Sequence, residues 1–597
     1  MHIARIKLWN FRKFGSEGDF DLNAPDLDLP LSKGTNVLVG ENDSGKTAIV
    51  DAIRFALGTL SLDWNRIGFD DFHGDTDRLR IELFFEKLSE EEGKNFIEWL
   101  SWEKDDNGNV TTALRLICDA RRSEERVFPY EVRAGADADG SQISAEAREY
   151  LKCTYLRPLR DAQAELVPRQ NSRLSRIFQG HPAFKGNDDD HHLVKLFGKF
   201  NDEIRSYFKG KDSEGNDLPD GQGKALKDQV DGFIHAFYSA ESDGLIDVSD
   251  GTLKSILERL MLSIKDCRNP GLGTLNRLFM AAELVHLSKQ NWSGLRTALI
   301  EELEAHLHPQ AQMRVIDELQ RRDNIQLILT SHSPNLTSKV PLRNLILCKG
   351  VNAFPLGEEF TKLDPDDYKF LECFLDVTKS NLFFAKGVIL VEGWAEELLV
   401  PALAKLLKAR ALIKQDLTEA GISVVNVGGT SYLRYAKIFL RKSDPEIGIP
   451  VSIITDLDVP EFEKEGDDFV AREPGALAAE KSAAARAKAK SLNDGPVRAF
   501  LAPDWTLEFS LQKSKSFGKL FEESFRSAHP RAGADNLEFE VAKKLLNKGL
   551  DKQHVAYLMA KAIEADISGP NKIAIKDDEA SAQYLIQGIK HACGISN

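Results

Sequence analysis

The stretch that decides the fold is GENDSGKT, residues 40–47. It follows the apolar run NVLV, residues 36–39, and a pattern typical of a helix extends from it to about residue 57. A glycine-rich turn between a strand and a helix is the setting of a P-loop, because backbone N–H groups and the positive end of the helix dipole face a phosphate there. We therefore expect ATP to be held by residues of this turn: Asn42, Gly45, Lys46 and Thr47.

Two later segments complete a nucleotide site of this type. Glu301 and Glu302 end an apolar stretch, where one carboxylate can contact the Mg²⁺ of ATP and the next can polarise the attacking water. His332 follows the apolar run at 325–330, where an imidazole can sense the γ-phosphate. We therefore place Glu301 in the metal shell, beside the Thr47 hydroxyl. Glu302 and His332 are the expected catalytic residues of ATP hydrolysis.

Length and composition bound the remaining possibilities. A chain of 597 residues needs roughly two to four domains. It has no long apolar run, no secretory pattern at its N-terminus and no Cys-x-x-Cys pair among its six cysteines. We therefore expect a cytoplasmic protein without membrane contact. The net charge of −15 neither indicates nor excludes nucleic acid, because a local basic groove is enough for phosphate contacts.

A second group of acidic residues lies in the carboxyl-terminal third. Glu392 ends one apolar run, Glu396 follows one helical turn later, and Asp456 and Asp458 follow another apolar run. Strand alternation points the two aspartates the same way, and parallel strands end at one edge of a sheet. Clustered carboxylates repel each other unless cations neutralise them. We therefore expect two Mg²⁺ or Mn²⁺ ions here, an arrangement that cleaves phosphodiesters.

The nucleotide motifs resemble those of the ABC-type ATPases related to RecF and SMC proteins. EELEAHLHP, residues 301–309, resembles their Walker B motif and D-loop, and NFRKF, residues 10–14, resembles their first-strand motif. The resemblance implies that Arg12 approaches the phosphates of ATP. It also implies that a degenerate signature before a helix, GLGTLN at residues 271–276, closes with Gly273 over ATP held by a second copy of the chain.

The acidic motifs resemble a different domain. Glu392-Gly393, then Gly428-Gly429, then Asp456-Leu-Asp458 is the order found in the Toprim domain of topoisomerases, primases and certain nucleases. An ABC-type ATPase followed by Toprim, with YLRPLRD at residues 155–161, is similar to the OLD (overcoming lysogenization defect) family. The implied fold class is α/β: an ABC-type (SMC/RecF-like) ATPase with a helical dimerisation insertion, followed by a Toprim domain with a parallel sheet.

The resemblance to OLD proteins also adds residues and a function. It implies that Glu508, in TLE at residues 506–508, is a further metal ligand and that Lys552 stabilises charge on the scissile phosphate, with Lys548 as its rival. It implies a Mg²⁺-dependent DNA endonuclease of anti-phage defence. Such an enzyme works as a homodimer or larger even oligomer, alone or beside a helicase or retron partner.

Domain limits follow from changes in sequence character. A stretch near 352–380 is expected to connect the two α/β units, and residues 476–492 to form a solvated surface helix. No convincing Q-loop glutamine precedes the insertion, and Gln163 is only a weak candidate, so the route from ATP to the second site stays open. The expected parts are an ATPase at 1–162 and 241–375, the helical dimerisation insertion at 163–240, and the Toprim nuclease domain at 376–597.

Two alternatives remain open at this point. One is a non-cleaving, ATP-gated DNA clamp of the SMC or RecF type, in which Toprim is only a scaffold. The absence of heptads long enough for coiled-coil arms and the intact acidic set count against it. The other is a nuclease directed at RNA, because recognition of 2′-hydroxyl groups leaves no recognisable mark in this sequence.

Overall fold

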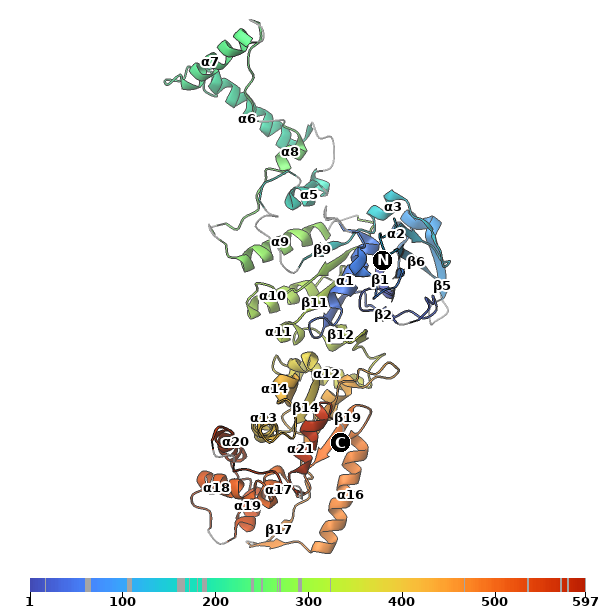
Figure 1. Ribbon diagram of the computed structural model, residues 1–597. Coiled ribbons are helices and arrows are strands. Elements are labelled where there is room, and N and C mark those ends of the chain that lie inside the picture. Colours follow the sequence, from blue (N-terminus) through green and yellow to red (C-terminus); the bar gives the residue numbers. More distant parts are fainter. Residues whose placement is uncertain are drawn as a thin grey trace.

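The computed structural model consists of three connected parts (Figure 1). It describes residues 1–597 except 17, 60–65, 105–109, 158–166, 171, 180, 185–189, 238–240, 249–250, 266, 268–269, 288–291, 323, 467, 534–535, 570–571, 577–578 and 596–597. Gln163 and the last residues of YLRPLRD therefore lie outside the described residues. A helical arm, drawn mainly in green, extends from an amino-terminal body, and a carboxyl-terminal α/β unit lies at the opposite end of that body (Figure 1). Within the described ranges, no helix is both long and apolar enough to cross a bilayer.

The phosphate-binding turn follows β3, an inner strand of a 6-stranded sheet that we call the P-loop sheet. Its order is β13-β12-β3-β11-β10-β9, and all neighbours are parallel except β12 and β13. Strands β3, β10 and β11 are buried along their whole length, as parallel strands covered on both faces are. The elements are β3 (Thr35–Val39), β9 (Thr154–Leu156), β10 (Thr297–Ile300), β11 (Gln326–Ser331), β12 (Leu345–Lys349), β13 (Asn352–Pro355), α1 (Lys46–Leu57), α10 (Pro309–Gln320) and α11 (Pro334–Thr337).

An antiparallel sheet forms the other layer of the amino-terminal body. Its path is β2-β1-β4-β6-β7-β8, and β5 also pairs with β6. Helix α1 contacts β4 and β6 of this sheet and β11 of the P-loop sheet, so it lies between the two layers and its apolar residues join both in one core. The elements are β1 (His2–Trp9), β2 (Leu27–Pro30), β4 (Arg78–Glu86), β5 (Leu100–Lys104), β6 (Val110–Arg121), β7 (Val132–Ala134), β8 (Ser141–Gln142), α2 (Glu90–Gly93) and α3 (Ala145–Glu149).

The helical arm leaves apolar side chains in solvent. Its helices are α5 (Arg173–Gln179), α6 (His192–Phe208), α7 (Gln222–Phe237) and α8 (Leu253–Leu257). Helices α6 and α7 pack together, yet Phe233 and Phe237 remain 63% and 81% exposed. Helix α8 packs against α5 and α6, so the arm continues beyond residue 240. At its base, Arg173 of α5 forms a buried ion pair with Glu283 of α9 (Leu272–Leu287), 2.6 Å between Nη2 and Oε2.

The carboxyl-terminal unit is built on a 4-stranded parallel sheet in the order β15-β14-β16-β19. Alternate side chains of β14 enter different cores: Val388 and Leu390 join the cluster of the P-loop sheet, and Ile389 and Val391 face α13, α20 and α21. The strands are β14 (Gly387–Val391), β15 (Ile422–Asn426), β16 (Val451–Thr455), β17 (Phe462–Glu465), β18 (Asp468–Ala471) and β19 (Val497–Leu501). The helices are α12 (Pro365–Phe374), α13 (Trp394–Ala409), α14 (Leu417–Ala420), α15 (Tyr432–Ala436), α16 (Pro474–Leu492), α17 (Leu507–Lys513), α18 (Gly518–Ala528), α19 (Leu537–Leu546), α20 (Lys552–Ser568) and α21 (Gln583–Ala592).

The stretch at 352–380 is part of the core and not a separating linker. It contains β13 and α12, and its residues Tyr368 and Leu371 are buried. They belong to one hydrophobic cluster that runs from Val37 of the P-loop sheet to Val451 of β16. The stretch is therefore not the simple connection that we expected. Its turn residues stand beside a short strand and a helix, and apolar residues of both belong to this shared cluster.

Candidate functional site

The P-loop holds its lysine in place with its own carbonyl groups. Lys46 Nζ donates to the carbonyl oxygens of Gly40, at 2.9 Å, and Glu41, at 2.6 Å, and to Ser44 Oγ at 3.1 Å. Gly45 has a φ of 96°, and a Cβ there would lie 2.7 Å from the ring of Phe14, so only glycine fits. Burial lowers the pKa of Lys46. A phosphate would compensate the desolvated ammonium better than carbonyl dipoles do.

The cavity at the P-loop measures about 630 Å³, within the range of roughly 300–1,000 Å³ that is usual for ligand pockets. The sequence-predicted residues that line it come from four segments and are Arg12, Asn42, Gly45, Lys46, Thr47, Glu302 and His332. Arg12 reaches it while its guanidinium pairs with Asp51, at 2.8 Å, and Asp71, at 2.9 Å. The structure therefore assembles the predicted phosphate-binding residues around one space.

Glu301 lies next to this cavity and is 2% exposed. Its carboxylate accepts a hydrogen bond from the Tyr155 hydroxyl at 2.6 Å and another from the Thr47 hydroxyl. Burial raises the pKa of Glu301, and these two hydrogen bonds oppose the rise. Thr47 and Glu301 are thus neighbours, as ligands of one Mg²⁺ must be. Sequence reasoning quoted Tyr155 within a family motif but gave it no role.

The turn after β10 positions Glu302 and a further acid. Glu302 has a φ of 44°, and its N–H donates to Thr330 Oγ1 of β11 at 3.0 Å. The carboxylate of Glu304 accepts the backbone N–H of His332, a contact that sequence reasoning missed although Glu304 follows the acidic pair by only two residues. Burial, and then the charge of Lys46, lower the pKa of His332. The imidazole is therefore neutral near pH 7.

Gly273 does not line the nucleotide cavity of its own chain. Its motif opens α9, which begins at Leu272, and does not precede the helix as expected. A Cβ at Gly273 would lie 2.3 Å from the carbonyl oxygen of His306, so a side chain is excluded there. Asn276 Nδ2 donates to the carbonyl of Ala305 at 3.3 Å. The candidate signature thus packs on the loop that resembles a D-loop.

Four of the predicted acidic residues lie together at the carboxyl edge of the parallel sheet. Glu392 follows β14, Asp456 follows β16, Glu396 is on the first turn of α13, and Glu508 is on the first turn of α17. Glu396 and Asp456 are each 8% exposed and Glu508 is 2% exposed. The backbone N–H of Leu507 donates to Asp456 Oδ1 at 2.7 Å, which ties α17 to β16.

Burial and neighbouring negative charges raise the pKa of Glu392, Glu396 and Asp456. Burial and the charge of Glu508 raise the pKa of Glu396 to about 7. Burial, Glu508 and Glu396 raise the pKa of Asp456 well above its ordinary value. Burial raises the pKa of Glu392, against the hydrogen bond from the Thr455 hydroxyl, and the charge of Asp458 adds to the rise. Buried Glu508 Oε1 has no hydrogen-bond partner. An oxygen-rich, negatively charged pocket with an unpartnered oxygen fits a hard divalent cation.

Lys552 lies beside two acidic residues of this cluster. Its Nζ lies 2.9 Å from Glu508 Oε2 and 3.9 Å from Asp456 Oδ2. Burial lowers the pKa of Lys552, but the carboxylates of Glu508 and Asp456 outweigh burial and raise it overall. The rival Lys548 lies in the loop before α20 and is exposed. The structure therefore brings Lys552, and not Lys548, to the acidic residues.

Asp458 is oriented differently from Asp456. Strand β16 ends at Thr455, and Asp458 has a φ of 62°, so the expected alternation does not extend to it and that prediction is wrong. Its side chain is 57% exposed and pairs with Lys488 at 2.6 Å. Lys488 also donates to the backbone oxygen of Asp456 at 2.7 Å. Helix α16, expected to be only a solvated surface, thus places one lysine on the acidic edge.

The cluster is arranged around lysines. Within the described part of the chain, no three histidine, cysteine or acidic side chains stand as close together as the ligands of one bound cation do. Lys552 pairs with Glu508, and Lys488 pairs with Asp458. A bound cation would have to replace one of these lysine ammonium groups as the partner of the carboxylates. The donors are therefore suitable in kind, and they need a small rearrangement of side chains to coordinate an ion.

A small cavity of about 200 Å³ lies between the P-loop and the residues that precede β14 and β16. It is lined by P-loop residues, by Cys348 and Lys349 at the end of β12, and by Lys386 and Ile449, which precede β14 and β16. Lys349 Nζ donates to the carbonyl of Gly448 at 3.0 Å. The two strands that end in Glu392 and Asp456 therefore begin beside the P-loop.

Comparison with known proteins agrees with this arrangement. Residues 35–338 match the family described as "AAA domain, putative AbiEii toxin, Type IV TA system", and residues 383–458 match "Overcoming lysogenization defect protein-like, TOPRIM domain". The chain is 24% identical over 495 residues to an OLD nuclease of Thermus scotoductus, an alignment that covers 79% of this chain and 84% of that one. It is 22% identical over 561 residues to Endonuclease GajA of Bacillus cereus, covering 79% of this chain and 78% of that one.

A solved structure, the C-terminal region of the Burkholderia pseudomallei OLD protein, is 23% identical with a TM-score of 0.22, and the match covers 35% of this chain and 98% of that one. The two family matches divide the chain as its two sites do. The first contains the P-loop, Glu301 and His332, and the second contains Glu392, Asp456 and Asp458. The chain therefore belongs to this AAA-domain family and, after that domain, carries a Toprim domain of the OLD-like type.

Proposed function

We propose that this protein is an ATP-dependent nuclease, in which ATP at the P-loop controls a divalent-metal-dependent DNA endonuclease in the Toprim domain. The observation that carries the proposal is the buried acidic cluster at the edge of the parallel sheet, with Lys552 beside it. Burial of several carboxylates costs stability unless a ligand compensates it, so this arrangement is typical of a functional site. A role in anti-phage defence is the biological context that the family suggests.

Metal binding would use the acidic residues of this edge. When bound, two Mg²⁺ or Mn²⁺ ions supply an activated water and stabilise the leaving oxygen of the phosphodiester. The residues that we assign to them are Glu392, Glu396, Asp456, Asp458 and Glu508. Lys488 holds Asp458 toward the edge, and the N–H of Leu507 fixes the carboxylate of Asp456. This chain thus provides oriented oxygen ligands from β14, β16 and two helices.

Lys552 contributes a fixed positive charge. Its ammonium lies within the acidic group, where the surrounding carboxylates keep it protonated. A substrate phosphate at this edge would lie close to it, and negative charge that develops on the phosphate during cleavage would be stabilised there. We therefore assign Lys552 as a catalytic residue, with no part in holding the ions.

We also assign roles to the residues at the P-loop cavity. Lys46 and Arg12 would contact the phosphates of ATP, and Thr47 with Glu301 would hold its Mg²⁺. Glu302 lines the cavity and would polarise the attacking water, and the neutral imidazole of His332 can donate one hydrogen bond to the γ-phosphate. ATP would therefore occupy the P-loop cavity.

A homodimer or larger even oligomer is part of the proposal. Gly273 lies outside the nucleotide cavity of its own chain, so only a second copy could bring it over ATP. The exposed Phe233 and Phe237 of the arm give a surface that self-association would bury. Gel filtration with and without ATP tests this: a mass of two or more chains is expected, and a monomer under both conditions would contradict it.

Cleavage of a panel of nucleic acids tests the function. We expect Mg²⁺- or Mn²⁺-dependent cuts in plasmid DNA that stop when the metal is chelated. The same assay with single-stranded DNA and RNA distinguishes the substrate classes, and cleavage of RNA alone would assign the RNA-directed alternative. ATP-dependent DNA binding without any cleavage would assign the clamp.

A further inference from the structure

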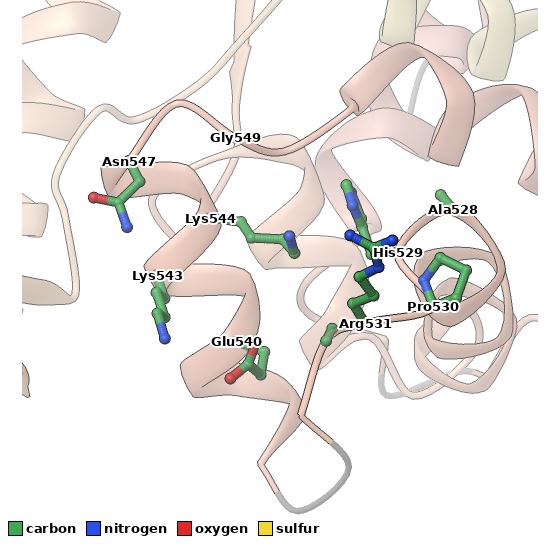
Figure 2. A pocket seen from close by; sticks show the side chains of 10 residues that line it. Ala528, His529, Pro530, Arg531, Glu540, Lys543, Lys544, Asn547 and Gly549 are labelled. Carbon is green, nitrogen blue, oxygen red and sulfur yellow. The ribbon is translucent and has the colours of Figure 1, made fainter.

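A basic pocket lies beside the first turn of α20, outside both sites described above. Its volume is about 530 Å³, and it is formed between the end of α18 and the outer face of α19 (Figure 2). The charged and titratable residues that line it are His529, Arg531, Glu540, Lys543 and Lys544. Figure 2 shows the side chains of Arg531 and Lys544 extending toward each other across the pocket.

The positive charges of this pocket are not compensated. Within the described residues, the side chains of Arg531, Lys543 and Lys544 form no ion pair and no hydrogen bond. Two nearby lysines do form ion pairs: Lys513 pairs with Glu461, and Lys552 pairs with Glu508. Three cations against one carboxylate, that of Glu540, repel each other unless an anion enters. A guanidinium and an ammonium that face one space are the groups that proteins use to bind phosphate.

His529 completes the lining and links it to the acidic site. Its Nε2 accepts the backbone N–H of Asp551 at 3.3 Å. Burial, and then the charge of Lys544, lower the pKa of His529, so the ring is neutral with its proton on Nδ1. Asp551 caps α20, and the next residue is Lys552. The pocket and the acidic cluster therefore share the first turn of one helix.

We propose that this pocket binds a backbone phosphate of the DNA, at a distance from the phosphate that is cut. The inference rests on the proposed nuclease function, because it assumes that a strand lies across the acidic edge beside Lys552. A DNA strand that passes this edge carries a phosphate at every nucleotide, so further phosphates must lie along its path. The pocket would fix the position of the strand without reading its sequence. A protein of net charge −15 needs such local basic sites to hold a polyanion.

The test is DNA binding as a function of salt concentration. Full-length Asp456→Asn protein, which should not cut, is titrated onto a fluorescently labelled duplex, alone and with Arg531→Ala, Lys544→Ala or both. Each single change should lower the slope of log affinity against log salt by about 1, and the double change should weaken binding by roughly tenfold or more. The matched control is Lys561→Ala, an exposed lysine on α20 away from the pocket, with binding unchanged. Thermal melting of every variant checks the fold.

The outcomes separate the two proposals. Unchanged affinity and slope in the pocket variants, with normal binding by the parent protein, would overturn the phosphate pocket alone. A parent protein that binds no DNA, and a wild type that cuts none, would overturn the proposed function together with the pocket. Calorimetry with sodium phosphate forms the second arm. Tight binding of inorganic phosphate in the absence of DNA, lost in Lys544→Ala, would assign the pocket to a free anion and overturn the assignment to DNA.

Discussion

The Nζ atom of Lys552 lies 2.9 Å from Oε2 of Glu508, and the two residues come from helices that flank the same strand end. The ammonium therefore neutralises part of a buried acidic group. The Lys552 ammonium would therefore compete with a bound cation for the Glu508 carboxylate. It would also lie close to any phosphate at this edge of the sheet. The two effects are separable by experiment.

Replacement of Lys552 by alanine should separate cleavage from metal binding. We expect cleavage to fall by about 10²–10³-fold, because a preorganised charge beside the phosphate is lost. Affinity for Mn²⁺, measured by calorimetry, should stay the same or rise, because the competing ammonium is gone. Lys552→Arg should restore part of the activity. Exposed Lys548 is the matched control, and a loss of cleavage in Lys548→Ala as large as that in Lys552→Ala would count against this assignment.

Replacement of Lys46 by alanine should abolish ATP hydrolysis. The Lys46 ammonium is the charge that the P-loop itself supplies, and its loss removes a cation that would contact the phosphates inside the cavity. Phosphate release is expected to fall to background, while Mn²⁺ affinity of the acidic site is retained. Retained turnover would place ATP elsewhere on the chain.

The stability of the metal-free protein should depend on Glu396. Its folded-state pKa of about 7 lies above the ordinary value of 4.5, so the stability that its protonated form contributes is complete below pH 4.5 and is lost as the pH rises through 7. Glu396→Gln has no carboxyl group to ionise, so it does not lose this stability as the pH rises. In chelator, the variant should gain on the order of 2 kcal/mol over wild type at pH 8 and much less at pH 5. Melting curves at the two pH values measure it, and an equal difference at both would refute the burial argument.

Communication between the sites should depend on Lys349. Its hydrogen bond to the carbonyl of Gly448 joins the end of β12 to the segment that enters β16. Lys349→Ala should leave ATP hydrolysis and metal affinity within about twofold of wild type, because this hydrogen bond lies outside both sites. The difference in cleavage rate with and without ATP should shrink. Lys369→Ala, on the exposed side of α12, is the control. An undiminished ATP effect in Lys349→Ala would assign coupling to another route.

The sequence predicted those features that depend on local pattern. The P-loop, its flanking strand and helix, and the strand that ends before Glu392 are confirmed, because buried parallel strands and glycine turns have clear local signals. The position of Asp458 was missed, because the strand ends earlier than alternation implies. Lys488 was missed because its partner lies 30 residues away in the chain, across a helix whose pattern shows only a solvated face. A contact between residues so far apart in the chain produces no periodic pattern in the sequence.

The roles of the residues within each site remain predictions. The role of Asp456 as a metal ligand is the most important of them for the proposed function. Plasmid cleavage in Mg²⁺ or Mn²⁺ by wild type and by Asp456→Asn, with Lys561→Ala as a folded control, is the most direct measurement. We expect metal-dependent cleavage by wild type and by the control, and none above background by Asp456→Asn, in which a neutral amide replaces the buried carboxylate that attracts the cation. Equal cleavage by wild type and Asp456→Asn would contradict it.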